Sequence, residues 1–265
     1  MKTSISTGII VTVEQIPILR DIIVAHNLDV FIRDTQDTQL LDEQWKPWVR
    51  RVRPQLLHCP ANIWLYTPSY AWPELQSHHR IRTIIAEQLQ QCIQMAKLLG
   101  TTGLVIPLEH VYSPLHDRIA YYLHTIETQL RANDLQMMVH AADAVTFDEI
   151  CAFFNNASFS TRVIMHSDAL ATAAAPPDHA HWYEEIAVND EDTIHEATWI
   201  SHRIIGAHEH ASAIRKKVVW AINTLPHIDA RDVAQDDADT FEQRADEQDQ
   251  IVSDSPVSDS DDKIT

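Results

Sequence analysis

A helix followed by a buried strand, residues 84–110, constrains the fold of this chain more than any other stretch. Apolar residues recur at three- and four-residue steps from Ile85 to Ala96, which gives a helix one apolar face. Gly100 follows at the position where a helix C-terminus favours a positive φ. Residues 103–108, GLVIPL, are apolar without alternation, as in a strand covered on both faces. The stretch therefore predicts half of a βαβ unit.

The same alternation of strand and helix recurs at intervals of roughly 30 residues along most of the chain. Further strands are expected at residues 8–13, 28–32, 62–67, 135–140, 161–166 and 185–189, with residues 225–229 as the candidate for a short eighth strand. Further helices are expected at residues 14–26, 40–58, 115–133, 147–155 and 212–224. Seven or eight parallel strands with right-handed crossovers favour an α/β TIM-type barrel over an open doubly wound sheet. The eighth unit of this barrel is the one that the sequence leaves incomplete.

Acidic charge is concentrated at the end of the chain. Of the formal net charge of −18, residues 229–265 carry −10, because they hold 13 Asp/Glu and 3 Lys/Arg. This segment has few large apolar residues, so we expect a disordered acidic tail after a barrel domain spanning residues 1–228. The tail is interpreted as a solubility segment, or alternatively as an interaction arm for a basic partner or a DNA mimic.

The location expected for the chain is intracellular. No signal peptide precedes the first strand, and no apolar run approaches the ~20 residues of a membrane span. The three cysteines, Cys59, Cys92 and Cys151, lack C-x-x-C spacing, which favours free thiols in a reducing compartment, the cytoplasm or the nucleus. With only 4 glycines, the chain has neither a P-loop nor a G-x-G-x-x-G motif.

Function in a barrel of this type is expected at the carboxyl ends of the strands. Residues 72–111, with their helix, LLG turn and LVIPL strand, resemble the "LG…LVxHPG" pattern of the endonuclease IV family. The order of motifs over residues 8–213 resembles the same family of metal-dependent apurinic/apyrimidinic endonucleases (AP endonuclease family 2). This family lies within the xylose isomerase-like TIM barrels, and the likeness is closest to its large-DNA-virus branch. The resemblance implies a cluster of three zinc ions that activates water and stabilises the departing phosphate.

The positions that the resemblance assigns to metal ligands are largely replaced. His140 stands where the family has a bridging glutamate, and the other replaced positions are Tyr66, Ile106, Ala169 and Ala187, where it has histidines. The sixth strand ends in His166-Ser167-Asp168 in place of Asp-Thr-x. A neutral imidazole cannot replace a carboxylate that bridges two cations. We therefore expect the three-metal cluster to be lost.

Two groups of residues remain as candidates for a binding site. His140, His166, His208 and His210 are all predicted to face one rim, where they could hold a single zinc at most. The alternative is that some of the chain's 16 histidines fall at strand ends without a role. The candidates for DNA contacts are Arg33, Tyr70 and Trp72, the aromatic pair by stacking on a base or sugar. Alternatively, the two aromatic rings cover the barrel mouth.

The sequence favours a non-catalytic function. We predict a degenerate endonuclease IV-like protein without catalytic residues or a cofactor, which serves in binding or structure and has DNA-repair ancestry. Its partner would be an unidentified protein, with DNA bound weakly at best because the barrel domain is acidic, and with no membrane contact. The alternative is an active AP endonuclease of base excision repair that keeps one zinc. A third class, a sugar-phosphate isomerase or epimerase, would need a carboxylate pair and a metal at the strand ends.

Overall fold

The structure, a computed structural model, describes residues 6–57, 59, 62–69, 79–108, 117–141, 162–166, 181–188 and 200–224. All described elements belong to one compact unit, Ile5–Pro226. The predicted helix at residues 147–155, the candidate strand at residues 225–229 and the acidic tail lie outside the described residues. The boundary between a barrel domain and a tail therefore stays a prediction.

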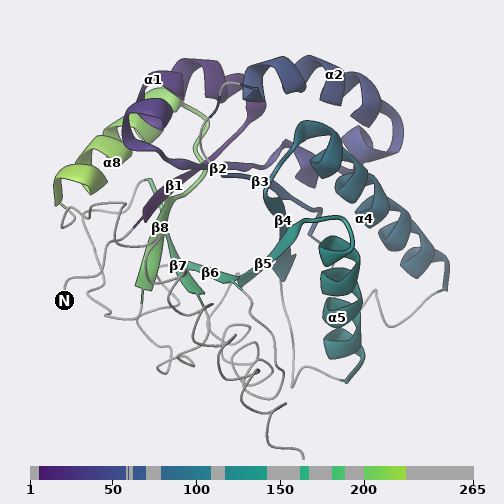
Figure 1. The fold of residues 1–265 in the computed structure, drawn as a ribbon. Coiled ribbons are helices and arrows are strands. Elements are labelled where there is room, and N and C mark those ends of the chain that lie inside the picture. The colour runs from purple at the N-terminus through teal and green to yellow at the C-terminus, as the bar shows by residue number, and fades with distance from the viewer. Residues whose placement is uncertain are drawn as a thin grey trace, which may run out of the picture. The chain divides into compact units, whose positions relative to one another are not determined.

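Eight parallel strands form a closed barrel in chain order, as Figure 1 shows. The strands are β1 (Ser6–Val11), β2 (Asp29–Ile32), β3 (Ile63–Tyr66), β4 (Gly103–Leu108), β5 (Gln136–Ala141), β6 (Arg162–His166), β7 (His181–Ile186) and β8 (Ile200–Ile205). The barrel closes where β8 pairs with β1 in parallel. The predicted TIM-type barrel is confirmed, and its eighth strand is present.

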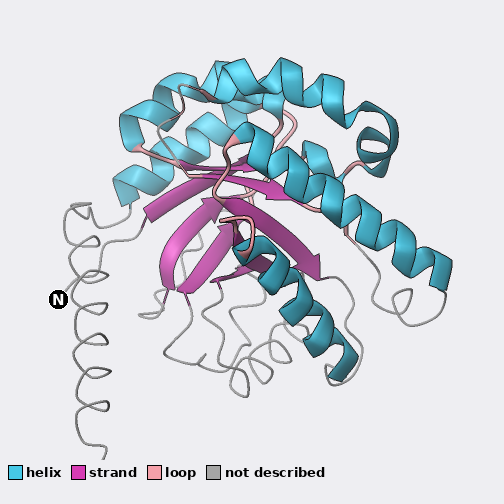
Figure 2. Ribbon diagram, turned by 45° about the vertical axis from the view of Figure 1, so that its right-hand side comes forward, coloured by secondary structure: helices cyan, strands magenta, loops and turns pink. Residues whose placement is uncertain are grey.

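Helices lie around the outside of this barrel (Figures 1 and 2). They are α1 (Ile16–His26), α2 (Trp45–Leu56), α4 (His79–Leu99), α5 (Asp117–Arg131) and α8 (Ala211–Thr224). Two short 3-10 helices, η1 (Val13–Gln15) and η2 (Asp34–Gln36), and a short π-helix, η3 (Leu40–Gln44), lie in the connections after β1 and β2. None of the helices that the structure describes combines the length and the apolar character needed to cross a membrane.

The stretch at residues 84–110 folds as its pattern predicts. α4 ends at Leu99, and Gly100 has a φ of 69°, which a residue with a side chain rarely adopts. Gly103 begins β4 where a Cβ would lie 2.2 Å from the carbonyl oxygen of Gln136. Cys92 is fully buried on α4, where burial raises the pKa of its thiol to about 12. The thiol of Cys92 is free, as expected.

Two apolar cores result from the alternation of side chains along the strands. The larger core lies between the outer faces of the strands and the helices, and includes Val11, Leu65 and Ile106. The smaller core fills the barrel interior with at least one residue from each strand. Its members are Ile10, Phe31, Trp64, Tyr66, Val105, Met138, Ile164, Tyr183 and Ile204.

The last two strands differ from the prediction. β7 is His181–Ile186, starting before the expected range of residues 185–189, and β8 precedes the last helix instead of following it. The physical reason is a buried ion pair on the outer face, where Arg203 Nε donates to Glu184 Oε2 at 2.8 Å. Both side chains are almost fully buried. Because each charge compensates the other, these strands tolerate charged residues that an apolar pattern does not predict.

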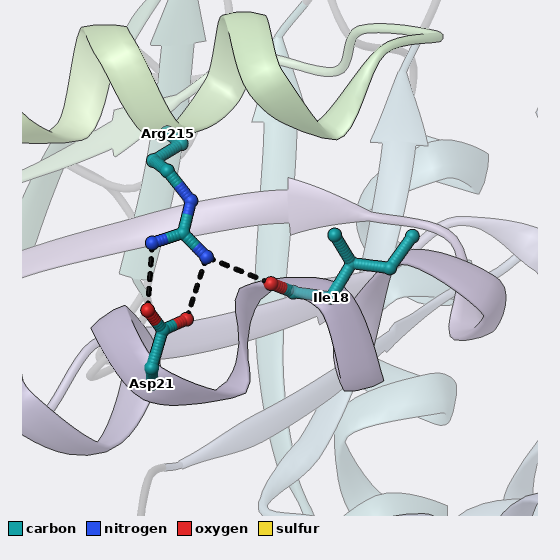
Figure 3. Close-up of polar contacts among 3 residues, drawn as sticks. All are labelled: Ile18, Asp21 and Arg215. Atoms are coloured by element: carbon teal, nitrogen blue, oxygen red, sulfur yellow. Dashed lines mark hydrogen bonds and ion pairs between the residues drawn. The ribbon is translucent and has the colours of Figure 1, made fainter.

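Helices α1 and α8 are joined by a bidentate ion pair (Figure 3). The two terminal nitrogens of Arg215 donate to the two carboxylate oxygens of Asp21 at 2.6 and 2.7 Å, and Nη2 also donates to the Ile18 carbonyl at 2.9 Å. Hydrogen bonding from Arg215 lowers the pKa of Asp21. Arg215 therefore links α1 to α8.

Candidate functional site

A small cavity of about 140 Å³, which we call the mouth cavity, lies at the carboxyl ends of the strands. Its lining residues are Ile10, Arg33, Gln36, Tyr66, Pro107, His140, Glu185 and Ala207. They come from several strands and from the loops that follow β2 and β8. The cavity thus occupies the end of the barrel where the fold places function.

Three polar side chains from different strands meet in the mouth cavity. His140 on β5 has its Nε2 atom 2.9 Å from Oε2 of Glu185 on β7. The opposite ring nitrogen of His140, Nδ1, lies 3.4 Å from the phenol oxygen of Tyr66 on β3. The Tyr66 and His140 rings meet edge to face, with centroids 5.8 Å apart. Both nitrogens of His140 therefore have protein neighbours.

The protonation of this cluster follows from its burial. Tyr66 is 2% exposed, and desolvation, followed by the nearby Glu185 charge, raises the pKa of its phenol well above the ordinary value. Tyr66 therefore keeps its proton and can donate it to Nδ1 of His140. A neutral imidazole that accepts this proton at Nδ1 carries its own proton on Nε2. The imidazole thus lies between the phenol, within hydrogen-bond distance of Nδ1, and the Glu185 carboxylate, 2.9 Å from Nε2.

A second and larger cavity of about 350 Å³ lies beside the first, and we call it the rim cavity. It is lined by Thr12, Arg33, Asp34, Asp37, Leu40, Trp48 and Arg51. Arg33 lines both cavities, because it follows β2 directly at the strand's carboxyl end. The rest of the rim cavity comes from the end of β1, from η2 and η3, and from α2.

The strand-end positions taken from the resemblance need correction at two strands. Ile106 packs in the outer core, so the β4 side chain that lines the mouth cavity is Pro107. Ala187 follows β7, and the side chain that β7 contributes to the mouth is Glu185. Sequence reasoning missed Glu185 because it placed this strand too late. The aromatic pair just before Glu184 was the available signal of an earlier strand.

Of the four histidines predicted to share one rim, the structure places one in the mouth cavity. His140 lines the mouth cavity, and the backbone of His166 pairs in register with Glu185, but the side chain of His166 lies outside the described part. His208 and His210 lie between β8 and α8, where Nδ1 of His208 accepts a hydrogen bond from the His210 amide at 3.0 Å. Neither of these two lines the mouth cavity. The four-histidine site stays a prediction.

A buried glutamine holds the loop that carries these two histidines. The side-chain amide of Gln15 donates to the carbonyls of His208 and Glu209 at 2.7 and 3.1 Å. Its oxygen accepts from the Thr12 amide at 2.9 Å. The β8–α8 loop is thus fixed to the end of β1 through its backbone.

Among the predicted DNA contacts, only Arg33 lies within the described residues, and Tyr70 and Trp72 lie outside them. Arg33 faces two cavities that also contain carboxylates. The DNA-binding role of the three residues therefore stays a prediction.

The donors in the mouth do not fit a metal ion. Within the described ranges, no three His, Cys, Asp or Glu side chains form a group that could hold one. Among the described residues, the mouth supplies one imidazole and one carboxylate, already in contact with each other, together with a neutral phenol. A catalytic zinc takes three protein ligands and a structural zinc four. No chemistry through a metal follows from these residues.

Comparison with known proteins supports the fold. No family model and no curated protein sequence matches the chain. The apo 3-keto-D-glucoside 4-epimerase YcjR from E. coli is a similar solved structure, with a TM-score of 0.58 and 11% identity over 84% of this chain and 100% of that one. A second is the IolI protein with a bound zinc atom, with a TM-score of 0.56 and 8% identity over 83% and 100%.

A third similar structure is a xylose isomerase domain-containing protein from Salmonella typhimurium LT2. It matches with a TM-score of 0.51 and 10% identity, over 82% of this chain and 96% of that one. Identities this low show the fold alone. The chain therefore shares the TIM-barrel fold with these proteins.

Proposed function

We propose that this protein is a binding barrel whose mouth takes a small polar ligand without a catalytic metal. The observation that carries the proposal is the 2.9 Å contact between His140 Nε2 and Glu185 Oε2. Among the described residues, the imidazole and the carboxylate that could serve as metal ligands in the mouth contact each other. The Tyr66 phenol occupies the remaining nitrogen of the imidazole.

The rest of the mouth supports the same proposal. Ile10, Pro107 and Ala207 contribute no metal ligands, and Arg33 brings a positive charge that opposes a bound cation. A three-metal phosphodiesterase needs several carboxylates to compensate closely spaced cations, and Glu185 is the carboxylate that lines this cavity. The mouth is concave and places a few polar groups among apolar ones, which suits the recognition of a small ligand.

The proposal also includes descent from a DNA-repair enzyme. It rests on the resemblance of residues 72–111 to the endonuclease IV pattern, and on the shared barrel. Under the proposal this ancestry survives in the fold, while the phosphodiesterase activity has been lost. The competing function is a working AP endonuclease that keeps one zinc.

A second candidate function is metal-free epimerisation of a sugar. It is favoured by Glu185, a carboxylate at the mouth beside an imidazole, which together could move a proton. Exchange of deuterium from D2O into D-glucose or D-fructose, followed by NMR, would reveal such chemistry. Exchange that disappears in a Glu185→Gln variant would replace the binding proposal by this one.

Metal content and cleavage of a duplex with one abasic site, measured on the same dialysed sample, test the proposal. We expect less than one metal ion per chain by elemental analysis and no nick. Two or more metal ions with a clean nick would overturn the proposal in favour of the repair nuclease. One metal ion without cleavage would point instead to the predicted histidine site.

Two variants test whether any bound metal lies in the mouth cavity. His140→Gln is expected to leave the metal content unchanged, because His140 already contacts Glu185 and Tyr66. His26→Gln, on the exposed side of α1, is the matched control. A metal ion that is lost in His140→Gln but kept in His26→Gln would show that the mouth does hold a metal.

A further inference from the structure

The mouth cavity and the rim cavity share one residue, Arg33. The mouth cavity, about 140 Å³, falls below the range of about 300–1,000 Å³ typical of small-molecule sites. The rim cavity, about 350 Å³, falls within that range. A ligand confined to the mouth would have little room, whereas a longer ligand could pass Arg33 and occupy both cavities.

Charge limits the kind of ligand that can do so. The cavities contain two guanidinium groups, Arg33 and Arg51, and three carboxyl groups, Asp34, Asp37 and Glu185. An anion entering here would meet the carboxylates, and a cation would meet the guanidiniums. The balance therefore favours a ligand without net charge.

The rim carboxyl groups are held in place by backbone amides. Asp34 Oδ2 accepts a hydrogen bond from the Val13 amide at 2.8 Å, and Asp37 Oδ1 accepts one from the Gln39 amide at 2.9 Å. Asp34 also accepts a hydrogen bond from its own backbone amide, whereas Asp37 keeps one oxygen for which the described residues show no hydrogen bond. The carboxylate oxygens are acceptors, and Arg33 and Arg51 are donors.

A hydroxyl group both donates and accepts, so it can pair with a carboxylate and a guanidinium that lie side by side. Thr12 adds a hydroxyl of its own to the rim cavity, while Leu40 and Trp48 provide an apolar wall. Polar edges and an apolar wall match a molecule with hydroxyl groups around its rim and C–H groups on its faces.

We infer that the ligand of this barrel is a neutral, hydroxyl-rich molecule about two sugar rings long, with one end in the mouth cavity and the other in the rim cavity, and with Arg33 between them. The inference rests on the proposed function, because it assumes that the mouth binds a ligand. It gives Arg33 a different role from the predicted DNA contact. Arg33 donates hydrogen bonds to a neutral molecule, so that binding depends little on salt.

Isothermal titration calorimetry with defined probes tests the inference. The probes are cellobiose and maltose for two rings, D-glucose for one ring, and D-glucose 6-phosphate and inorganic phosphate for anions. We expect at least one disaccharide to bind about tenfold more tightly than D-glucose or either anion. Its Kd should change less than about twofold between about 50 and 500 mM NaCl, since no ion pair with the ligand is screened.

Three variants locate the binding. Arg51→Gln replaces a guanidinium of the rim cavity alone by a shorter amide with fewer donors, and should weaken the disaccharide by about fivefold to tenfold while leaving D-glucose unchanged. Tyr66→Phe, in the mouth cavity alone, should weaken both probes. Arg50→Gln is the matched control, because Arg50 is exposed on the same helix and lines neither cavity. It should weaken neither.

Any other result contradicts one part of the inference. Tightest binding by an anion, lost at high salt, would contradict the neutral ligand. A disaccharide that responds to Tyr66→Phe but not to Arg51→Gln would contradict the two-cavity span while keeping the mouth as a binding site. If no probe binds, the inference fails, and the metal and cleavage measurements then decide the proposed function separately.

Discussion

The two ends of the barrel interior hold similar residues in different surroundings. At the amino ends of the strands, which we call the floor, lie Asp29, Trp64, Arg162, Tyr183 and His202. Each contacts another side chain of the protein by a hydrogen bond or a ring contact. Asp29 accepts a hydrogen bond from Asn62 at 3.0 Å, the Arg162 guanidinium lies 5.5 Å from the centre of a Trp64 ring, and the rings of Tyr183 and His202 stack 4.2 Å apart.

The mouth also holds an acid, a base and a tyrosine, but it opens into two cavities. The floor is closed above its polar residues by the stacked rings of Phe31 and Trp64, which are 6.2 Å apart and nearly parallel. Gly8 and Gly103 leave room for these rings, since a Cβ at either position would come within 3 Å of one of them. The difference teaches that the same residue types stabilise the barrel at its floor and can bind ligands at its mouth.

Truncation of Trp64 should give the largest difference between the two ends. Trp64 is 1% exposed, and Trp64→Ala should lower the free energy of unfolding by about 3–5 kcal/mol, because a buried cavity replaces the indole. Trp64→Phe, which keeps a ring, should lose less than half of that. Urea unfolding followed by circular dichroism measures both. A loss below about 1 kcal/mol for Trp64→Ala would show that the floor is not the stabilising end.

Two adjacent glutamates on β7 extend the comparison to the outer wall. Glu184 is fully buried and paired with Arg203, so Glu184→Gln should lower the free energy of unfolding by about 2–3 kcal/mol, since it leaves a buried cation uncompensated. Glu185→Gln, one residue further and in the mouth, is the matched control and should cost about 1 kcal/mol or less. Equal losses in urea unfolding would contradict the assignment of Glu185 to binding.

The same strand shows how far the sequence predicts the molecule. Residues 84–110 could be predicted because their helix face and their strand are both apolar, and the structure gives α4 and β4 there. Strands β7 and β8 could not, because Glu184 and Arg203 lie next to polar residues in sequence, and their mutual compensation exists only once the strands pair. A hydrophobic pattern predicts a buried strand only where the buried residues are apolar. It does not predict a charged residue that is buried beside an opposite charge.

The candidate site, like the fold, could be predicted only in part from the sequence. The resemblance placed His140 and the replaced ligand position Tyr66 at the ends of predicted strands, and both line the mouth. Glu185 was missed with its strand, and Ile106 was assigned inward although it packs in the outer core, one residue from Pro107. A shift of one residue moves a side chain to the other face of a strand. Side-chain direction at a strand end therefore needs the register, which the sequence leaves open.

A pH dependence should separate the floor from the mouth more finely. Burial raises the pKa of Asp29 to about 6, against the opposing hydrogen bond from Asn62. Between pH 3.8, the ordinary pKa, and pH 6 the folded chain binds more protons at Asp29 than the unfolded chain. Its contribution to stability therefore falls as pH rises through this window.

Asp29→Asn removes this effect while keeping an oxygen that can accept from Asn62. It should raise the free energy of unfolding at pH 7 by about 1–2 kcal/mol, below the full value of a two-unit shift because Asp29 is partly exposed, and change it little at pH 4. Urea unfolding at both pH values measures this. Glu87→Gln, at an exposed position on α4, is the control. A gain that is equal at the two pH values would contradict a titrating floor carboxylate.

Tyr66→Phe should give the smallest change in stability and the clearest change in binding. The variant keeps the buried ring and removes a hydroxyl whose contact with His140 Nδ1 is long, 3.4 Å, so the free energy of unfolding should change by less than about 1 kcal/mol. Saccharide binding should weaken, because the phenol proton no longer fixes the imidazole facing Glu185. A large loss of stability with unchanged binding would show that Tyr66 stabilises the barrel, as the floor residues do, and does not serve binding. The assignment of stability to the floor and of binding to the mouth would then be wrong at Tyr66.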